Sequence, residues 1–257
     1  MTEKTRTCLT QVIILADRTK GIHVPEEPVP GFKRHVLPEH ADLLEQAGAF
    51  RRMMEGRRSV REFSARDVPE SVVRELVRTA GTAPSGANKQ PWRFVAVKDA
   101  ELKSEIRLAA EEEERLFYEK RASETWLEDL KPFMTDSEKP FLEIAPWLII
   151  VFKVMGPDPD QPVEGDNGRV YYVNESVGIA CGLFLAAAHN AGLATLTHTP
   201  SPMKFLTGIL ERPSNERPFL VIPLGYPAVD CMVPDIARKD IDQIMTVDRG
   251  TDQSTSG

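Results

Sequence analysis

The stretch APSGANKQPWRFVAV, Ala83 to Val97, contains a change from loop to strand around which the rest of the chain can be arranged. Pro84 to Asn88 are turn-forming or small residues, which predict a loop. Small side chains let backbone N–H groups approach a ligand closely. Gln90-Pro91-Trp92 then leads into Arg93–Val97, whose β-forming residues predict a strand. A loop of this composition is more often an ordinary turn, so its meaning depends on the neighbouring segments.

A cluster of arginines precedes this stretch, in the sequence RRSVR from Arg57 to Arg61. Guanidinium groups form forked hydrogen bonds with phosphate oxygens, and the hydroxyl of Ser59 could add one more. The alternative is a basic, exposed helix end, where the helix dipole favours cations. Composition alone does not separate the two. Apolar residues at three- and four-residue steps predict helices before the cluster, over His40–Arg57, and after it, from Pro69 to Ala80.

An acidic run follows the predicted strand, in EEEERLFY from Glu111 to Tyr118, on a helix predicted from Ala100 to about Lys120. Glu114 and Tyr118 are four residues apart, so a helix places them on one face. With the ammonium of Lys139 downstream they could hold a zwitterion. The carboxylate would accept from an α-ammonium and the lysine would pair with an α-carboxylate. Spacing alone favours the simpler interpretation, a solvated helix face.

The connection from Arg121 to Lys139 is charged and weakly periodic. A mobile lid has this kind of sequence, and so does a plain surface connection. Ala145–Val154 is a continuous apolar run, which predicts a strand buried on both faces, and Phe219–Leu224 predicts another. Between them, Val170–Gly192 is apolar nearly all round and predicts a buried helix. On that helix we expect Cys181 to be a core residue rather than a nucleophile.

Composition and charge exclude several classes of protein. The chain has 257 residues and a net charge of −7, which argues for solubility and against general nucleic-acid binding. Its cysteines, Cys8, Cys181 and Cys231, are odd in number and widely spaced, which fits a reducing compartment. No apolar run reaches membrane-spanning length. We therefore expect a soluble, cytoplasmic protein without a membrane, nucleic-acid or metal partner.

Common nucleotide and hydrolase motifs are absent from the sequence. It contains no GxGxxG, GxxxxGK[ST], HExxH or GxSxG. A Rossmann NAD domain, a P-loop NTPase, a zincin and an α/β-hydrolase are each disfavoured. Any nicotinamide cofactor would have to bind without the GxGxxG motif.

Taken together, several segments resemble the nitroreductase superfamily of FMN enzymes and, within it, the iodotyrosine deiodinases. The resemblance extends from roughly His40 to Val247, with family-like order and spacing. RRSVR and PSGANKQPW indicate the superfamily, and the acidic run with Tyr118 and Lys139 indicates the deiodinase branch. The segments are RRSVR (57–61), TAGTAPSGANKQPWRFVAVKD (79–99), EEEERLFYEKR (111–121), NESVGIACGLFLAAAHNAGL (174–193), THTP (197–200), LGYP (224–227) and RKDIDQIM (238–245).

The resemblance implies an α+β, nitroreductase-like fold, with a central, mostly antiparallel sheet flanked by helices. It implies an intertwined homodimer with FMN at the subunit interface. We expect an N-terminal arm over residues 1–38, an FMN domain over 39–248 with a lid at about 112–139, and a disordered tail over 249–257. The chain starts without the membrane anchor of the animal members, so a membrane location is not expected.

Site residues follow from the resemblance by position. Two positions are expected to be catalytic: Thr199, whose hydroxyl would reach flavin N5, and Ala87, whose backbone N–H would meet the substrate phenolate. The zwitterion and the lid would be held by Glu114, Tyr118 and Lys139. The residues expected to contact FMN are Arg57, Arg58, Ser59, Val60, Arg61, Ser85, Gly86, Thr197, His198, Thr199 and Arg238.

The implied function is FMN-dependent reductive dehalogenation of halogenated tyrosines, such as iodotyrosine to tyrosine and iodide. A general nitroreductase or quinone reductase on the same scaffold is the first alternative. A non-enzymatic protein that binds flavin or an amino acid is the second. The electron source is left open between NADPH acting directly and NADPH acting through a reductase partner.

Overall fold

The computed structural model describes residues 42–157 and 168–248, together with Gly31, Lys33, His35 and Leu37. The arm expected over 1–38 lies almost entirely outside the described residues, and the tail expected over 249–257 lies wholly outside them. The chain divides into two compact units, Met1–Gly48 and Ala49–Gly257. The second unit contains the sheet and every expected site residue, and the fold below is the fold of this unit.

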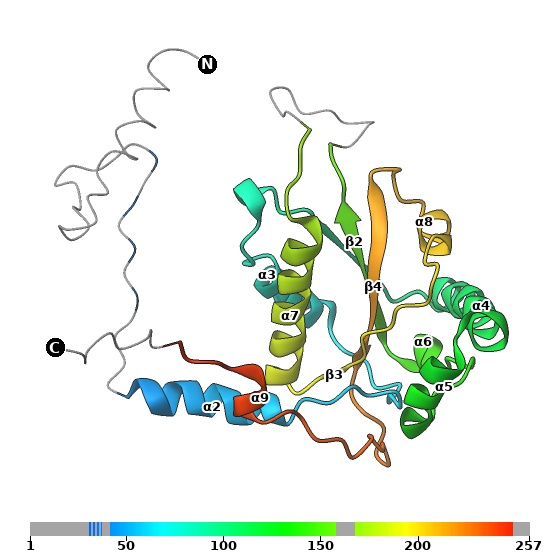
Figure 1. The fold of residues 1–257 in the computed structure, drawn as a ribbon. Helices are drawn as coiled ribbons and strands as arrows, with labels where there is room; N and C mark the ends of the chain where they lie inside the picture. Colours follow the sequence, from blue (N-terminus) through cyan, green and yellow to red (C-terminus); the bar gives the residue numbers. More distant parts are fainter. Residues whose placement is uncertain are drawn as a thin grey trace, which may run out of the picture. The chain divides into compact units, whose positions relative to one another are not determined.

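Four strands form one sheet in the order β1-β2-β4-β3, and every neighbouring pair is antiparallel. The strands are β1 (Trp92–Val97), β2 (Trp147–Val154), β3 (Ala194–Thr195) and β4 (Glu216–Gly225). Figure 1 shows helices on both faces of this sheet. The predicted α+β class, with an antiparallel sheet flanked by helices, is confirmed.

The helices lie close to their predicted positions, except that no helix was predicted at α5 or at α6. The α-helices are α2 (Leu43–Glu55), α3 (Glu70–Ala80), α4 (Ala100–Leu116), α5 (Glu124–Leu130), α6 (Phe141–Ile144), α7 (Val173–Asn190), α8 (Phe205–Ile209) and α9 (Ile241–Ile244). The shorter turns are the 3-10 helix η1 (Gly86–Asn88), the π-helical turn η2 (Phe117–Arg121) and the 3-10 helix η3 (Lys131–Phe133).

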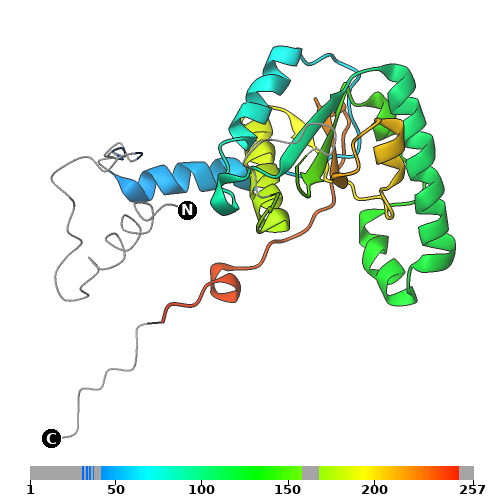
Figure 2. The same cartoon turned by 90° about the horizontal axis from the view of Figure 1, so that it is seen from above.

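Strand β2 carries the core on both of its faces. Successive side chains of a strand point to opposite faces of the sheet. Leu148, Ile150 and Phe152 pack into a cluster with α4, α6 and α8, whereas the alternate residues pack with α3 and α7. Figure 2 shows these two groups of helices on opposite sides of the strands. Because both faces are covered, Trp147–Phe152 is continuously apolar although the sheet is antiparallel, and the predicted double burial is confirmed for these residues.

Helix α7 is buried on one face only. Val177, Cys181 and Phe184 are among the residues that pack against the sheet. On the other side Ile179 is 46% exposed, and no described atom lies near the Cβ positions of Gly178 or Gly182. The prediction of a helix buried all round is therefore wrong for the single chain. Its second apolar face has no partner among residues 42–157 and 168–248.

The burial of Cys181 and the composition of the helices bear on two further predictions from the sequence. Burial raises the pKa of the Cys181 thiol to about 12, so the prediction of a core cysteine rather than a nucleophile is confirmed. Among the described residues, no helix combines the length and the apolar composition that crossing a membrane requires.

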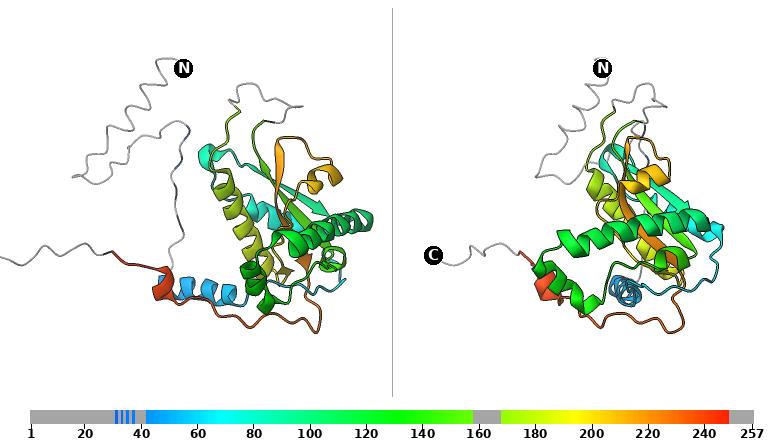
Figure 3. Two further views of the ribbon diagram at one scale, coloured as in Figure 1. Left: turned by 45° about the vertical axis from the view of Figure 1, so that its right-hand side comes forward. Right: turned by 90° about the vertical axis from the view of Figure 1, so that its right-hand side faces the viewer.

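Helix α4 carries the acidic run across one face of the sheet (Figure 3). It begins at Asp99, whose carboxylate accepts a hydrogen bond from the Leu102 backbone N–H at 2.9 Å. The ammonium of Lys103 is buried and donates to the carbonyls of Glu143 and Ala145, at 2.8 and 2.9 Å. These bonds fix α4 to the segment that joins α6 to β2.

Gly225, at the end of β4, lies closely against Pro146, and a substitution can test this contact. A Cβ atom at Gly225 would lie 2.5 Å from Cδ of Pro146, closer than atoms of that kind can approach. We expect Gly225→Ala to lower the free energy of unfolding by about 1–3 kcal/mol, the usual cost of overpacking. Urea denaturation of the two proteins measures this difference.

Gly208→Ala is the matched control, because no described atom lies within 4 Å of that Cβ position and Gly208 lies in helix α8. Its unfolding free energy should stay the same or rise by up to about 1 kcal/mol, the helix preference of alanine over glycine. Equal destabilisation by both substitutions would contradict the account of Gly225.

Candidate functional site

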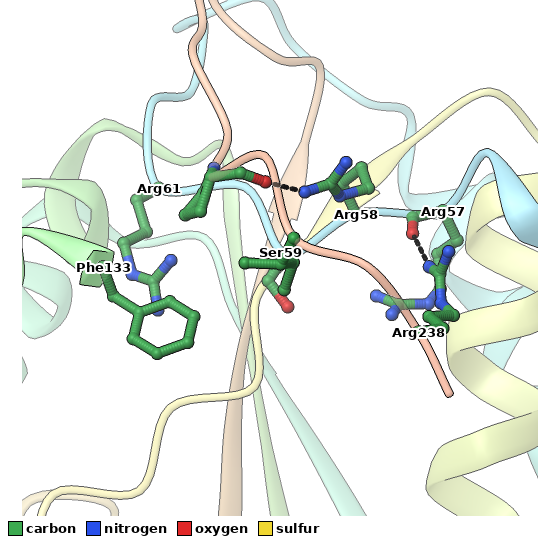
Figure 4. A pocket seen from close by; sticks show the side chains of 8 residues that line it. Arg57, Arg58, Ser59, Arg61, Phe133 and Arg238 are labelled. Atoms are coloured by element: carbon green, nitrogen blue, oxygen red, sulfur yellow. Dashed lines mark hydrogen bonds between the residues drawn. The ribbon is translucent and has the colours of Figure 1, made fainter. Parts of the chain in front are cut away.

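The arginine cluster lies in the loop after α2, beside β3. Ser59 forms a parallel bridge with Thr195, and the Val60 N–H donates to the Thr195 carbonyl at 3.1 Å. These bonds direct the arginines away from the sheet and around a cavity of about 160 Å³. Figure 4 shows Arg57 and Arg238 on one side of Ser59, and Arg61 on the other. The lining residues are Arg57, Arg58, Ser59, Arg61, Phe133, Pro234, Ile236 and Arg238.

Backbone carbonyls, rather than carboxylates, orient two of these arginines. Arg238 donates to the carbonyl of Arg57 at 2.9 Å and to that of Glu55 at 3.2 Å. Arg58 donates to the carbonyl of Pro234. The segment that follows β4 is thereby tied to the arginine loop by hydrogen bonds to neutral carbonyls, which do not neutralise the positive charges.

The electrostatics of the cavity fit an anion. Burial, and then the charges of Arg238 and Arg58, lower the pKa of Arg57. Burial also lowers the pKa of Arg61. In the described part of the chain, no carboxylate forms an ion pair with Arg57 or Arg61. A phosphate would supply the missing negative charge and accept several charge-assisted hydrogen bonds, so these residues fit the phosphate of FMN.

The strand-like segment after β3 continues toward this cavity. His198 exchanges two backbone hydrogen bonds with Val221, at 2.8 and 2.9 Å, and its side chain is buried. Thr197 and Thr199 are exposed, as the alternation of an extended chain requires. Burial, and then Lys139 and Arg61, lower the pKa of His198 to about 3, so its imidazole is neutral.

The three residues expected to hold a zwitterion do lie together. Lys139 is 5% exposed, and its Nζ lies 3.3 Å from Oε2 of Glu114 and 5.6 Å from the centre of the Tyr118 ring. The Tyr118 hydroxyl donates to Oγ1 of Thr135 at 3.0 Å. Burial raises the pKa of Tyr118, so its phenol remains a hydrogen-bond donor. Lys139 also donates to the carbonyl of Asp136.

Arg61 connects these features into one group of residues. Its charge acts on both Tyr118 and His198, and Phe133 from the connection after α5 lines the arginine cavity. We call this set the arginine–lid group, after the arginines and the segment for which a lid was predicted. Its members are Arg57, Arg58, Ser59, Val60, Arg61, Glu114, Tyr118, Phe133, Lys139, Thr197, His198, Thr199 and Arg238.

The loop of Ser85, Gly86 and Ala87 is not part of that group. A Cβ atom at Gly86 would lie 2.9 Å from Cβ of Tyr171, just before α7 begins. Gly56, next to the arginines, lies instead by His189 in the last turn of α7. The 18 residues of α7 span about 27 Å. The two sets of expected FMN contacts therefore lie at opposite ends of α7 in one chain (Figure 1).

The separated loop has an unusual backbone. Ala87, Asn88 and Gln90 have positive φ angles of 51°, 52° and 47°, and neighbouring Tyr172 has one of 49°. Such angles are uncommon outside glycine, and they concentrate at ligand sites where the surrounding structure holds them in place. The conformation makes this loop a candidate for presenting backbone groups to a ligand.

Some neighbours of the site were missed by the sequence analysis. The sequence indicates Phe133 only as a possible anchor of the connection after Arg121, and nothing about its spacing relates it to the arginines. The exposed Tyr171 and Tyr172 pack against the Gly86 loop, whereas the sequence pattern places them only at the start of a helix. In each case the contact joins distant segments, and no local pattern reports it.

Known proteins resemble this chain in sequence. A sequence model of the nitroreductase family matches residues 54–226. An iodotyrosine deiodinase from Haliscomenobacter hydrossis is 56% identical over 209 residues, which cover 81% of this chain and 93% of that protein. An iodotyrosine deiodinase from Nematostella vectensis is 43% identical, over 86% of this chain and 82% of the relative.

Solved structures have the same fold. A crystal structure of oxidized iodotyrosine deiodinase bound to FMN and 3-iodo-L-tyrosine superimposes with a TM-score of 0.65 at 30% identity, over 79% of this chain and 99% of that one. A nitroreductase with bound FMN from Bacteroides fragilis, at 19% identity, has a TM-score of 0.56 over 77% of this chain and 98% of its own. The chain belongs to the nitroreductase family and, within it, to the iodotyrosine deiodinases.

Proposed function

We propose that this protein removes halogen reductively from halogenated tyrosines, with FMN as its cofactor. The observation that carries the proposal is the buried ion pair of Glu114 and Lys139 beside Tyr118, next to the uncompensated arginines. Its relatives support the proposal, because the solved deiodinase of this fold holds FMN and 3-iodo-L-tyrosine.

The Glu114–Lys139 pair suits an amino acid in its zwitterionic form. A buried ion pair loses much of its hydration, and leaving either partner alone is costly. A zwitterion can insert with its ammonium on Glu114 and its carboxylate on Lys139, so each charge exchanges one partner for another. Tyr118, kept protonated, adds a donor at the same place. The site therefore selects a substrate with both charges over a plain aromatic.

Arg57, Arg58, Ser59, Arg61 and Arg238 would hold the FMN phosphate and the polar chain next to it, with Thr197–Thr199 alongside. When bound and reduced, FMN would supply the two electrons and the proton that replace a carbon–halogen bond by a carbon–hydrogen bond, with release of halide. The chain's own residues would bind and orient FMN and the substrate and would exclude water from them. Lys139 is already buried in the single chain.

Two residues would act at the reacting ring and the flavin. The Ala87 N–H would donate to the phenolate oxygen, as a preorganised donor does at a site of negative charge. The positive φ of Ala87 supports this role, because such conformations are common at ligand sites. The exposed hydroxyl of Thr199 would reach flavin N5.

A homodimer would complete the site. The Ser85–Ala87 loop and the arginine–lid group lie at opposite ends of α7, so one chain does not assemble them. The outward face of α7 has exposed Ile179 and open glycines, and a second copy could bury that face. Each site would then take its arginine–lid group from one chain and its loop from the other. Electrons would come from NADPH, directly or through a reductase.

A general nitroreductase or quinone reductase on this scaffold is the second candidate. It needs the FMN contacts but gives no reason for a buried Glu114–Lys139 pair. The two functions therefore differ in how they respond to changes in that pair.

We expect Glu114→Gln and Lys139→Ala to lower kcat/KM for iodotyrosine by at least about a hundredfold, since each leaves a buried charge without its partner. Bound FMN and turnover of a nitroaromatic should stay within about threefold of the wild type. Release of iodide and tyrosine measures the first effect. Lys98→Ala, which removes an exposed ion pair with Asp67, is the control. Undiminished deiodination in both variants would exclude zwitterion recognition.

Replacement of Arg57 tests the anion site. We expect Arg57→Gln to weaken FMN binding at least about tenfold, the loss of one charge-assisted hydrogen-bond donor. The stability of the cofactor-free protein should not fall, because the variant removes a charge that Arg238 and Arg58 oppose. Flavin fluorescence and urea denaturation provide the two measurements.

Arg78→Gln, at an exposed pair with Glu75, is the matched control and should change neither quantity. Normal FMN affinity in Arg57→Gln, or loss of folding without FMN, would contradict the assignment of this cavity.

Mixed dimers test where the loop belongs. Lys139→Ala disables the arginine–lid group, and Gly86→Ala should displace the loop through contact with Tyr171. If each site combines two chains, a heterodimer of the two variants has one doubly altered site and one intact site. Coexpression of differently tagged chains should therefore restore up to about half of the wild-type activity. Restoration would be absent if each chain carried a whole site.

A further inference from the structure

The four glutamates of the acidic run have four different environments. Glu112 pairs with Arg115 and Glu113 pairs with Arg121 toward the surface. Glu114 reaches Nζ of Lys139. Glu111 faces inward with Glu114, as the i, i+3 spacing of a helix requires, and its side chain is 16% exposed. The zwitterion site uses Glu114, but not Glu111.

Glu111 binds the backbone of Lys139 rather than its side chain. One oxygen, Oε1, accepts the Lys139 N–H at 2.6 Å and also lies 2.6 Å from Nε of Arg107. Nη1 of Arg107 in turn donates to Glu143 at 2.8 Å. Hydrogen bonds to Glu111 and then Glu143 raise the pKa of Arg107, which keeps it charged. Arg107 thus joins α4 to α6 and holds the Glu111 carboxylate in place.

Lys139 lies where the chain leaves the connection after α5 and re-enters the core. Its carbonyl accepts the Leu142 N–H at 3.0 Å, so Glu111 fixes one side of the residue and α6 fixes the other. Phe141 and Leu142 are buried immediately afterwards. The backbone from which the ammonium extends is therefore held on both sides, while the side chain is left to reach Glu114.

We infer that Glu111 is a positioning residue for the zwitterion site: by holding the backbone N–H of Lys139, it sets the ammonium at its distance from Glu114. This inference rests on the proposed function, and it adds a residue that contacts neither substrate nor cofactor. The effect should be confined to the end of the substrate that carries the two charges. Iodotyrosine has that end, and an iodophenol without the amino-acid group lacks it.

The test compares Glu111→Ala, Glu111→Gln and the control Glu112→Ala, all loaded with FMN. The control removes only a surface pair with Arg115 that is about half exposed on both sides. Quenching of flavin fluorescence gives the dissociation constants of iodotyrosine and 2-iodophenol, and iodide release gives KM and kcat.

For Glu111→Ala we expect the dissociation constant and KM for iodotyrosine to rise roughly tenfold or more, as loss of one charge-assisted hydrogen bond does. The value for iodophenol, the FMN content and kcat should each change by less than about threefold. Glu111→Gln keeps an oxygen that can accept the Lys139 N–H, so it should lie between Glu111→Ala and the wild type. Glu112→Ala should match the wild type.

Unchanged iodotyrosine affinity in Glu111→Ala would overturn the inference. So would equal losses for both ligands, or loss of FMN, because either result would assign Glu111 to general structure. If the wild-type protein itself fails to bind and deiodinate iodotyrosine, the proposed function fails instead. The wild-type measurement thus separates the two failures.

Discussion

The buried contact between Lys139 and Glu114 is the interaction on which the site depends. Two opposite charges are taken out of water at the point where the chain returns to the core. Such a pair is not a reliable source of stability, because desolvation offsets much of the attraction. Substrate binding, rather than stability, explains the ion pair beside the arginine cavity, since a zwitterion can pair with both of its charges. Helix α4 supplies the carboxylate, and α6 anchors the segment that supplies the ammonium.

The length of α7 sets the second constraint on the molecule. Its buried face packs on the sheet, and its two ends carry the two halves of the expected site about 27 Å apart. A second copy of the chain that covered the open face of α7 would account both for this exposed face and for the separation of the two parts of the site. Apolar surface would be buried, and a loop with a strained backbone at Ala87 would meet the arginine–lid group of the other chain.

The sequence predicted most of the fold, because its elements are marked by local patterns. Ala145–Phe152 is apolar throughout since both faces of β2 are covered, and Glu114 and Tyr118 share a face because of helical spacing. The helices α5 and α6 were missed, because a charged, weakly periodic segment and a helix of four residues carry little signal. The contact of Glu111 with the Lys139 backbone joins residues 28 positions apart, so no spacing rule reports it. The separation of Gly86 from the arginines likewise appears only in three dimensions.

One anaerobic experiment tests the central claim most directly. The FMN-loaded protein is reduced, iodotyrosine is added, and the flavin absorbance is followed while tyrosine and iodide are quantified. The account predicts that the flavin becomes oxidised again as one tyrosine and one iodide appear for each flavin. It would be contradicted by a flavin that stays reduced with iodotyrosine but is readily oxidised by a nitroaromatic, because this would assign the scaffold to a general nitroreductase.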